Sequence, residues 1–291
     1  MKHLSLPSYA KINIGLLIKG KRQDGFHEIE TVLKQISLKD TLELTLSSNQ
    51  EIMIECSHPD VPEDQANLCA RAALLLRKIG DVSSGGVHIR LTKNIPVGAG
   101  LGGGSSNAAV TLLGLNKLWK LKFSAAELEG FASEIGSDVP FFIKGGTARA
   151  TGKGEILNQT TFSINHPLVV VYPKITISTK WAYKQINLDL TNTKKNITLP
   201  HFEGSVYGNN AFPSSFKNDF EEFIFLEYPL LEEIKSQMDR GGALFSSLSG
   251  SGSAIYGIFR EYNQAENMTK IFQQSYLTYI TRETEWGYKD I

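Results

Sequence analysis

The chain has 291 residues, in which 30 lysines and arginines balance 30 aspartates and glutamates, so its formal net charge is +0 at pH 7. A chain of this length predicts about two domains, or one large α/β domain. The balanced charge argues against a basic nucleic-acid-binding surface and against an acidic tail, and the 41% hydrophobic content excludes a disordered or fibrous protein.

The start of the chain predicts no targeting segment. Lys11 and Asn13 interrupt its apolar residues, so it lacks the hydrophobic core of a signal peptide. No stretch of the sequence reaches the ~18 apolar residues that a membrane helix needs. We therefore expect a cytoplasmic protein with no membrane partner.

The first half of the chain alternates between strand-like and helix-like patterns. Alternating β-rich runs predict strands, and apolar residues at helical spacing predict helices. Strands are expected at 8–19, in two runs within 29–46, at 50–56 and at 87–91; helices are expected at 67–79, 106–119 and from Ser124 to Gly136. A polar turn at 20–28 separates the first two strands.

The second half predicts a similar mixture. A glycine-rich segment at 145–157 is followed by a buried strand at 167–172, a long surface loop at 185–217, helix at 220–240, a second glycine–strand unit at 248–259 and helix at 262–274. We expect the boundary near residue 158, which gives domains of 1–158 and 159–291, each with mixed helices and strands.

The most informative segment is a glycine-rich loop ahead of the helix expected at 106–119. Five of the seven residues from 98 to 104 are glycine, which allows a ligand to approach the backbone closely. Unpaired N–H groups at the start of the helix and the helix dipole then favour a phosphate group. The candidate phosphate-binding residues are Pro96, Val97, Gly98, Ala99, Gly100, Leu101, Gly102, Gly103, Gly104, Ser105 and Ser106.

Two familiar phosphate-binding motifs fit this loop poorly. The spacing of Gly98, Gly100 and Gly103 matches the dinucleotide fingerprint, but no acidic residue follows about twenty positions later. A P-loop needs lysine and then serine or threonine after its last glycine, whereas Ser105 and Ser106 follow Gly104 here. A simple turn would need only one or two glycines.

Other polar residues leave two interpretations open. Lys11, within an apolar strand, is either a snorkelling lysine or a cation beside a reacting phosphate. Asp138 is either a helix cap or a carboxylate that accepts a proton from a substrate. Phe26 and His27 form either a solvated turn or a site that reads a base. The second glycine unit, 248–253, is either a hairpin turn or a wall of the same pocket. The histidines show no metal-ligand spacing, so we expect no protein metal site.

The motifs taken together resemble the GHMP kinases. The blocks at 8–32, 95–110 and 135–146 are similar to one family within that group, the 4-diphosphocytidyl-2-C-methyl-D-erythritol kinases, and the similarity resumes at 218–219 and 247–257. The resemblance implies an α+β fold, an α/β arrangement of two lobes. The N-terminal lobe would be ribosomal S5 domain 2-like and bind ATP, and the C-terminal lobe would be ferredoxin-like and bind the substrate.

The resemblance also implies an activity. Members of this family transfer the γ-phosphoryl group of ATP to the 2-hydroxyl of a small-molecule substrate, a cytidine diphosphate derivative of methylerythritol. The reaction belongs to the non-mevalonate isoprenoid pathway. Mg²⁺ is expected with ATP, although no pair of carboxylates marks its site. The family's catalytic lysine and aspartate correspond to Lys11 and Asp138.

Binding residues are implied in the same way. The adenine side of the ATP site corresponds to Asn67 and Lys93, beside the glycine-rich loop. The cytidine pocket corresponds to Asn13, Phe26, His27, Lys153, Thr179 and Tyr183. The family commonly has tyrosine where Phe26 stands, so the stacking face is kept and the hydroxyl is lost.

Two rival functions are less well supported by the residues. A GHMP kinase for homoserine or a mevalonate derivative would have no use for a base-reading pair such as Phe26 and His27. A catalytically silent nucleotide sensor would not need both Lys11 and Asp138. The balanced charge, with no basic stripe of interleaved aromatic residues, argues against a nucleic-acid partner.

Overall fold

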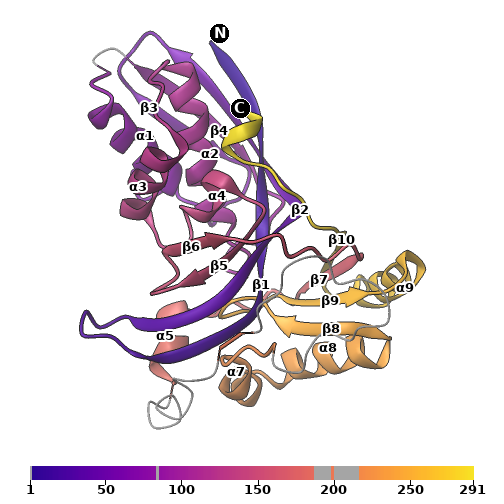
Figure 1. Cartoon of the computed structure of the whole chain (residues 1–291). Coiled ribbons are helices and arrows are strands. Elements are labelled where there is room, and N and C mark those ends of the chain that lie inside the picture. The colour runs from indigo at the N-terminus through magenta and orange to yellow at the C-terminus, as the bar shows by residue number, and fades with distance from the viewer. Residues whose placement is uncertain (1, 83–84, 187–197, 200–215) are drawn as a thin grey trace.

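The computed structural model describes residues 2–82, 85–186, 198–199 and 216–291. Two β-sheets, each with helices packed on it, form the two parts of the molecule (Figure 1). This arrangement confirms the predicted two-lobed α+β organisation. Within these described residues, none of the helices has the length and apolar character to cross a bilayer.

The first sheet contains the expected N-terminal strands. Its order is β3-β4-β2-β5-β6, with β1 paired to β2, and only the β3–β4 pair is parallel. The strands are β1 (His3–Lys21), β2 (His27–Ser47), β3 (Ile52–Cys56), β4 (Gly86–Thr92), β5 (Thr147–Thr151) and β6 (Ile156–Gln159). Strands β5 and β6 lie in the region where the sequence predicted only a glycine-rich segment, and its glycines lie before and between them.

The hairpin of β1 and β2 is longer than expected and bulged. The two runs predicted within 29–46 are one continuous strand, because the register shift between Tyr9 and Ala10 accommodates the residues between Ile36 and Lys39 as a bulge. A second shift falls at Gly15, whose φ of +68° suits glycine, and Thr31 Oγ1 donates to its carbonyl oxygen at 2.6 Å. The hairpin extends beyond the other strands of the first sheet, and its turn projects on the side away from the second sheet (Figure 1).

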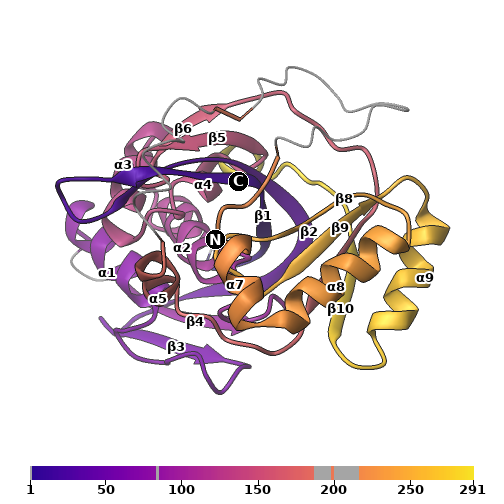
Figure 2. The ribbon, with the colours of Figure 1, turned by 90° about the horizontal axis from the view of Figure 1, so that it is seen from below.

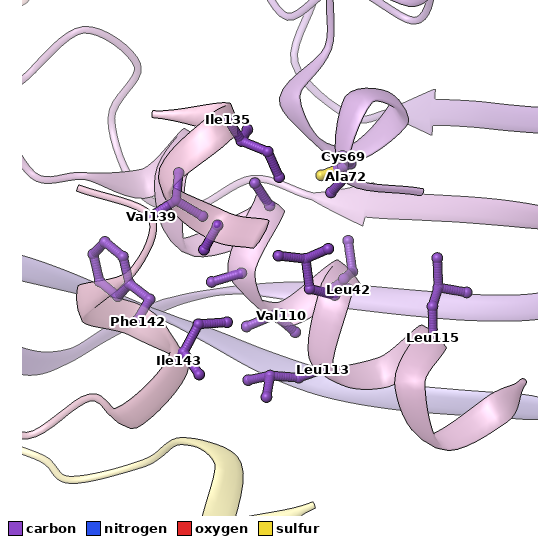
Figure 3. Close-up of a cluster of buried hydrophobic side chains, with 14 of the residues drawn as sticks. Leu42, Cys69, Ala72, Val110, Leu113, Leu115, Ile135, Val139, Phe142 and Ile143 are labelled. Carbon is purple, nitrogen blue, oxygen red and sulfur yellow. The ribbon is translucent and has the colours of Figure 1, made fainter. Parts of the chain in front are cut away.

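Helices pack on the first sheet and enclose its main core. They are α1 (Leu68–Ile79), α2 (Gly103–Leu118), α3 (Ala125–Ile135) and α4 (Phe141–Lys144). The predicted cap at Ser124 is present, as a capping box with Glu127, and α3 ends at Gly136. Helix α2 is buried on nearly all sides, since α1, α3 and α4 flank it on the sheet. Its Val110 and Leu113 lie in the core with Val139 and Phe142 (Figure 3).

The second sheet is antiparallel, with the strand order β10-β7-β9-β8. Its strands are β7 (Leu168–Tyr172), β8 (Ala243–Leu248), β9 (Ile255–Phe259) and β10 (Leu277–Thr281), and its helices are α7 (Glu221–Glu227), α8 (Pro229–Arg240) and α9 (Tyr262–Phe272). Helices α8 and α9 cover one face of the sheet (Figure 2). The single helix predicted at 220–240 is two helices, because Pro229 lacks an N–H group and begins a new helix.

The two sheets share a core and are joined by the end of the chain. Ile12 and Ile14 of β1 pack in one cluster with Val170 of β7 and Tyr256 of β9. After β10 the chain returns to the first sheet and ends in a 3₁₀ turn, η1 (Tyr288–Asp290) (Figure 1). The division into 1–158 and 159–291 therefore stays a prediction. Most of the long loop predicted at 185–217 lies outside the described residues.

Candidate active site

The glycine-rich loop connects β4 to α2 in a conformation that only glycine adopts readily. Gly98, Gly100 and Gly102 have φ values of +69°, +78° and +69°, in the left-handed region. Helix α2 begins at Gly103, three residues before the predicted start at Ser106. The N–H groups of its first turn have no partner within the helix, so they are available to an anion at this end.

A cavity of about 340 Å³ lies against this loop. Residues 96–105 line it, together with Asn67, Lys93 and Asn107. Ser105 belongs to the wall of the cavity, whereas Ser106 does not. The buried Ser106 hydroxyl accepts a hydrogen bond from Ser8 Oγ at 2.8 Å. The predicted ATP-binding residues other than Ser106 therefore surround one space.

Asn67 and Lys93 line the cavity but also have partners within the protein. Asn67 caps α1, since its Oδ1 accepts from the Cys69 N–H at 2.8 Å. The Lys93 ammonium pairs with the carboxylate of Asp40 and donates to Asn107 Oδ1 at 3.1 Å. Asp40 was not predicted as a functional residue, because nothing in the β-rich run within 29–46 distinguishes a buried carboxylate from an exposed one.

The second glycine unit closes the site from the other sheet. Ser249 Oγ donates to the Gly100 carbonyl oxygen at 3.0 Å, and the Ala254 N–H donates to the Ala99 carbonyl oxygen at 3.1 Å. A Cβ atom on Gly100 would lie 2.1 Å from the Ser249 carbonyl oxygen. Both interpretations left open for 248–253 are confirmed: the segment is the turn between the antiparallel strands that precede and follow it, and its Gly250 and Ser251 also form a wall of a cavity. Asn218 holds this unit through its amide, which donates to the Leu248 and Gly250 carbonyl oxygens.

Lys11 lies on β1 beneath the glycine-rich loop, with only 3% of its surface exposed. Its ammonium donates to Asn13 Oδ1 at 2.6 Å and to the Gly100 carbonyl oxygen at 2.9 Å. Burial lowers the pKa of the Lys11 ammonium, and the nearby Asp138 carboxylate opposes that shift. The side chain is held inside the site by these contacts, so it does not snorkel to solvent.

Asp138 lies on the turn between α3 and α4, and this turn places its carboxylate beside the Lys11 ammonium. Its Oδ2 atom is 3.6 Å from Lys11 Nζ, and its side chain is 40% exposed. Because α3 ends at Gly136 and Pro140 precedes α4, Asp138 caps neither helix. An accessible carboxylate beside a buried ammonium has the arrangement of a proton acceptor that is oriented by a cation.

A larger cavity, of about 860 Å³, lies between the β1–β2 turn, α5 (Thr179–Lys184) and the second glycine unit. All the residues predicted for substrate binding line it, and so do both predicted catalytic residues: Lys11, Asn13, Phe26, His27, Asp138, Lys153, Thr179 and Tyr183. Gly100 and Gly102 line both cavities. The Lys11–Asp138 pair therefore lies where the two cavities meet. Helix α5, which carries Thr179 and Tyr183, was not predicted.

Aromatic side chains from the β1–β2 turn and from α5 line the larger cavity. The His27 ring stacks on Tyr183, with centroids 4.9 Å apart and an interplanar angle of 19°. Phe26 is 53% exposed, and the Lys153 ammonium lies 4.8 Å from its ring centroid. Burial, with a contribution from Lys21, lowers the pKa of His27, so this ring is neutral at pH 7 and has one donor and one acceptor.

The larger cavity is cationic although the whole chain is neutral. Among the described residues that line it, one is an aspartate, Asp138, and five are lysines: Lys11, Lys21, Lys153, Lys180 and Lys184. Such an excess of one charge in a concave site raises the local concentration of anionic ligands. The cavity therefore suits a substrate with several negative charges.

Comparison with known proteins identifies the family. The family models described as "GHMP kinases N terminal domain" and "GHMP kinases C terminal" match residues 67–146 and 208–277. A protein from Chlorobium phaeobacteroides (strain BS1) named 4-diphosphocytidyl-2-C-methyl-D-erythritol kinase is 42% identical to this chain, over 97% of this chain and 98% of its own length. This chain belongs to the 4-diphosphocytidyl-2-C-methyl-D-erythritol kinase family.

Solved structures agree with this membership. A crystal structure of 4-(cytidine 5'-diphospho)-2C-methyl-D-erythritol kinase superposes with a TM-score of 0.79 at 29% identity, covering 96% of this chain and 99% of that one. The mevalonate kinase of Methanococcus jannaschii has a TM-score of 0.71 at 13% identity, with coverage of 97% and 98%, and shares the fold alone. The chain is thus a small-molecule kinase with the GHMP fold, as the sequence predicted.

Proposed function

We propose that this member of the 4-diphosphocytidyl-2-C-methyl-D-erythritol kinase family transfers the γ-phosphoryl group of ATP to the 2-hydroxyl of 4-diphosphocytidyl-2-C-methyl-D-erythritol. The products are the 2-phosphate and ADP, and the step belongs to the non-mevalonate route to isoprenoids. One observation carries the proposal: two cavities meet at Gly100 and Gly102, beside the Lys11–Asp138 pair. We place the reaction in the cytoplasm, without a nucleic-acid partner.

The smaller cavity holds the phosphates of ATP in this proposal. The left-handed glycines let the backbone approach them closely, and the free N–H groups at the start of α2 face them with the positive end of the helix dipole. Phosphoryl transfer depends mainly on positioning and on stabilising charge that develops on the phosphate oxygens. Backbone donors in a fixed loop supply both.

The larger cavity holds the cytidine diphosphate substrate. His27, Tyr183 and Phe26 supply flat faces and hydrogen-bonding groups for a base, and the surrounding lysines complement a diphosphate. Phe26 offers its ring without the hydroxyl that the family commonly has there, so recognition at this position relies on stacking. The substrate then points its 2-hydroxyl toward Asp138.

The reaction needs a base because the acceptor is a hindered tertiary alcohol. Asp138 accepts the hydroxyl proton as the oxygen forms a bond to the γ-phosphorus, and the bond from that phosphorus to the β,γ-bridging oxygen breaks. Lys11 stays protonated and holds the carboxylate, the hydroxyl and the γ-phosphate in register. Its bonds to Asn13 and Gly100 fix its ammonium at this point.

Mg²⁺ is part of the proposal as the expected partner of ATP. Within the described part of the chain, no group of three or more His, Cys, Asp or Glu residues is spaced to hold a metal ion. These residues fit a Mg²⁺ ion that binds mainly phosphate oxygens and water, because such an ion needs only one or two protein oxygens. We assign that role to the Ser105 hydroxyl, which lines the smaller cavity, and the ion would neutralise phosphate charge.

An ADP-release assay with three acceptors tests the proposal. We expect turnover with 4-diphosphocytidyl-2-C-methyl-D-erythritol and none with homoserine or mevalonate. Turnover with one of the two small acids, and none with the cytidine compound, would overturn the substrate assignment while keeping the kinase activity. As a second arm, Phe26→Ala should raise the KM for the cytidine substrate at a cost of about 1–3 kcal/mol, the range of other base-stacking contacts.

A further inference from the structure

Asp40 is a buried carboxylate that the mechanism above does not use. It lies on β2, directly opposite Ser8 of β1, and none of its surface is exposed. A fully buried carboxylate is costly unless hydrogen bonds and a counter-charge surround it. The partners of Asp40 are therefore informative, since they show what its burial holds in place.

The partners of Asp40 come from both ends of the glycine-rich loop. Its Oδ1 atom accepts from the Asn94 and Ile95 N–H groups at 2.7 and 2.8 Å, just before the loop. Its Oδ2 atom accepts from Asn107 Nδ2 at 2.9 Å, in the second turn of α2, and pairs with the Lys93 ammonium. One side chain thus joins the segment that enters the loop to the helix that leaves it.

The same network continues under α2 and makes this junction rigid. Asn107 Nδ2 also donates to Ser8 Oγ at 2.8 Å, and Ser8 Oγ donates to Ser106 Oγ at 2.8 Å. The Lys93 ammonium lies so close to the start of α2 that a Cβ atom on Gly103 would be 3.1 Å from it. Asp40 itself does not line the nucleotide cavity, whereas Lys93 and Asn107 do.

A loop with five glycines needs such a frame. Each glycine loses more backbone entropy on ordering than any other residue, so the loop by itself would populate many conformations. Phosphoryl transfer requires the donor amides to be held within a fraction of an ångström of their working positions. Fixing both ends of the loop reduces the number of conformations available to the glycines between them.

We propose that Asp40 is a positioning residue for the phosphoryl donor: it fixes both ends of the glycine-rich loop and the Lys93 ammonium, so that the first-turn N–H groups of α2 face ATP. The proposal rests on ATP being the ligand of the smaller cavity, as the proposed function states. It predicts a selective effect, on ATP rather than on the acceptor, since Asp40 is not among the described residues that line the larger cavity.

Asp40→Asn tests this with Glu283→Gln as the matched control. Glu283 is also a largely buried carboxylate that pairs with a lysine, Lys34, and accepts from a hydroxyl and two backbone N–H groups, but these partners lie on β2 and in residues 163–165, not at the ends of the glycine-rich loop. We expect both variants to lose stability. Only Asp40→Asn should raise the KM for ATP, by about tenfold or more, with the KM for the acceptor within about twofold of wild type.

These kinetic measurements distinguish a wrong proposed function from a wrong role for Asp40. Wild-type enzyme that releases no ADP with any acceptor would refute the proposed function. Active wild type, with an Asp40→Asn variant whose KM values for ATP and acceptor are unchanged or change equally, would overturn the role of Asp40 alone. Calorimetric titration with ADP in the absence of acceptor should show the same loss of affinity in Asp40→Asn and none in Glu283→Gln.

A milder variant keeps the proposal testable if Asp40→Asn does not fold. Ser8→Ala removes the brace between Asn107 and Ser106 but leaves the Asp40 carboxylate and the Lys93 ammonium paired. It should raise the KM for ATP by about two- to fivefold without changing the KM for the acceptor, because one neutral hydrogen-bonded link of the network is lost. Unchanged ATP affinity in a folded Ser8→Ala protein would contradict the proposal.

Discussion

At the scale of single residues, the site depends on one buried cation and one accessible carboxylate. Lys11 is almost fully covered, whereas Asp138 is 40% exposed and 3.6 Å away. The difference in burial separates their roles, because an exposed carboxylate exchanges protons readily while a buried lysine is held in a fixed position.

The first prediction concerns the proton acceptor. Asp138→Asn should lower kcat by roughly 10²–10⁴, the usual contribution of a positioned general base, while ATP binding is retained. Steady-state kinetics would measure this, with Glu266→Gln as a control that neutralises an exposed carboxylate on α9 paired with Lys270. A kcat like that of wild type in Asp138→Asn would remove Asp138 from the chemistry.

The second prediction concerns the titration of Lys11. Burial lowers its pKa from the ordinary 10.5, and Asp138 raises it again in part, so Asp138→Asn should lower it further. Because the folded protein releases this proton at a lower pH than the unfolded chain, the unfolding free energy should rise with pH between the folded pKa and 10.5. NMR titration of the labelled lysine side chain would show this. A midpoint at or above 10.5 would contradict it.

At the scale of elements, the phosphate site is made by the contact of two glycine units from different sheets. The residue types of the first loop were evident in the sequence, but the helix was expected to begin at Ser106 because glycine is a poor helix former. The structure begins α2 at Gly103, and glycine is required there because a Cβ atom would meet Ile95 and the Lys93 ammonium at 3.0–3.1 Å. Close packing outweighs helix propensity at this position.

The third prediction tests the contact between the glycine units. Gly100→Ala should destabilise the protein by about 1–3 kcal/mol, because alanine is strained at a φ of +78° and its Cβ would meet the Ser249 carbonyl oxygen. Gly130→Ala is the matched control, since that exposed glycine of α3 has open space around it and should gain roughly 0.5–1 kcal/mol. Urea denaturation would measure both, and equal effects would show that the contact is unimportant.

At the scale of the whole molecule, the net charge is balanced although the larger cavity carries an excess of positive charge. The lysines that line the larger cavity are compensated elsewhere on the chain, so composition excluded a basic surface without revealing the site. A second whole-molecule feature is the ion pair of Lys34 with Glu283. It joins β2 to the segment after β10, and Glu283 also accepts from the Ile164 N–H at 2.9 Å, in the connection between the sheets.

The fourth prediction concerns this ion pair and its pH dependence. Burial alone would raise the pKa of Glu283, but the bonds from Lys34, Ser163 and Ile164 outweigh it and lower the pKa below 4.5. The resulting stability is present above pH 4.5 and is lost as pH falls through the folded pKa. Glu283→Gln should therefore cost about 1–3 kcal/mol near pH 7 and progressively less in acid, as measured by denaturation at several pH values. A cost that stays constant down to pH 2 would contradict it.

Much of the architecture was accessible from the sequence because it is local. Strand alternation, helix caps such as Ser124 and the glycine-rich loop all depend on neighbouring residues, and the blocks that resemble the family are contiguous. The sequence predictions that were wrong or missing also have physical causes. Helix α5 is too short for a periodic pattern, the bulge in β2 looked like a break between two strands, and Pro229 divided a helix that apolar spacing alone made continuous.

The sequence by itself determined the family, the two-lobed α+β organisation and the residue types of the phosphate loop, since these follow from short-range patterns. Only the tertiary structure decided that Lys11 and Asp138 lie 3.6 Å apart, that the second glycine unit closes the first, and that Asp40 lies beneath the loop. Those distances are set by strand register and by helix packing between segments far apart in the chain, and neither can be read from the spacing of residues along it.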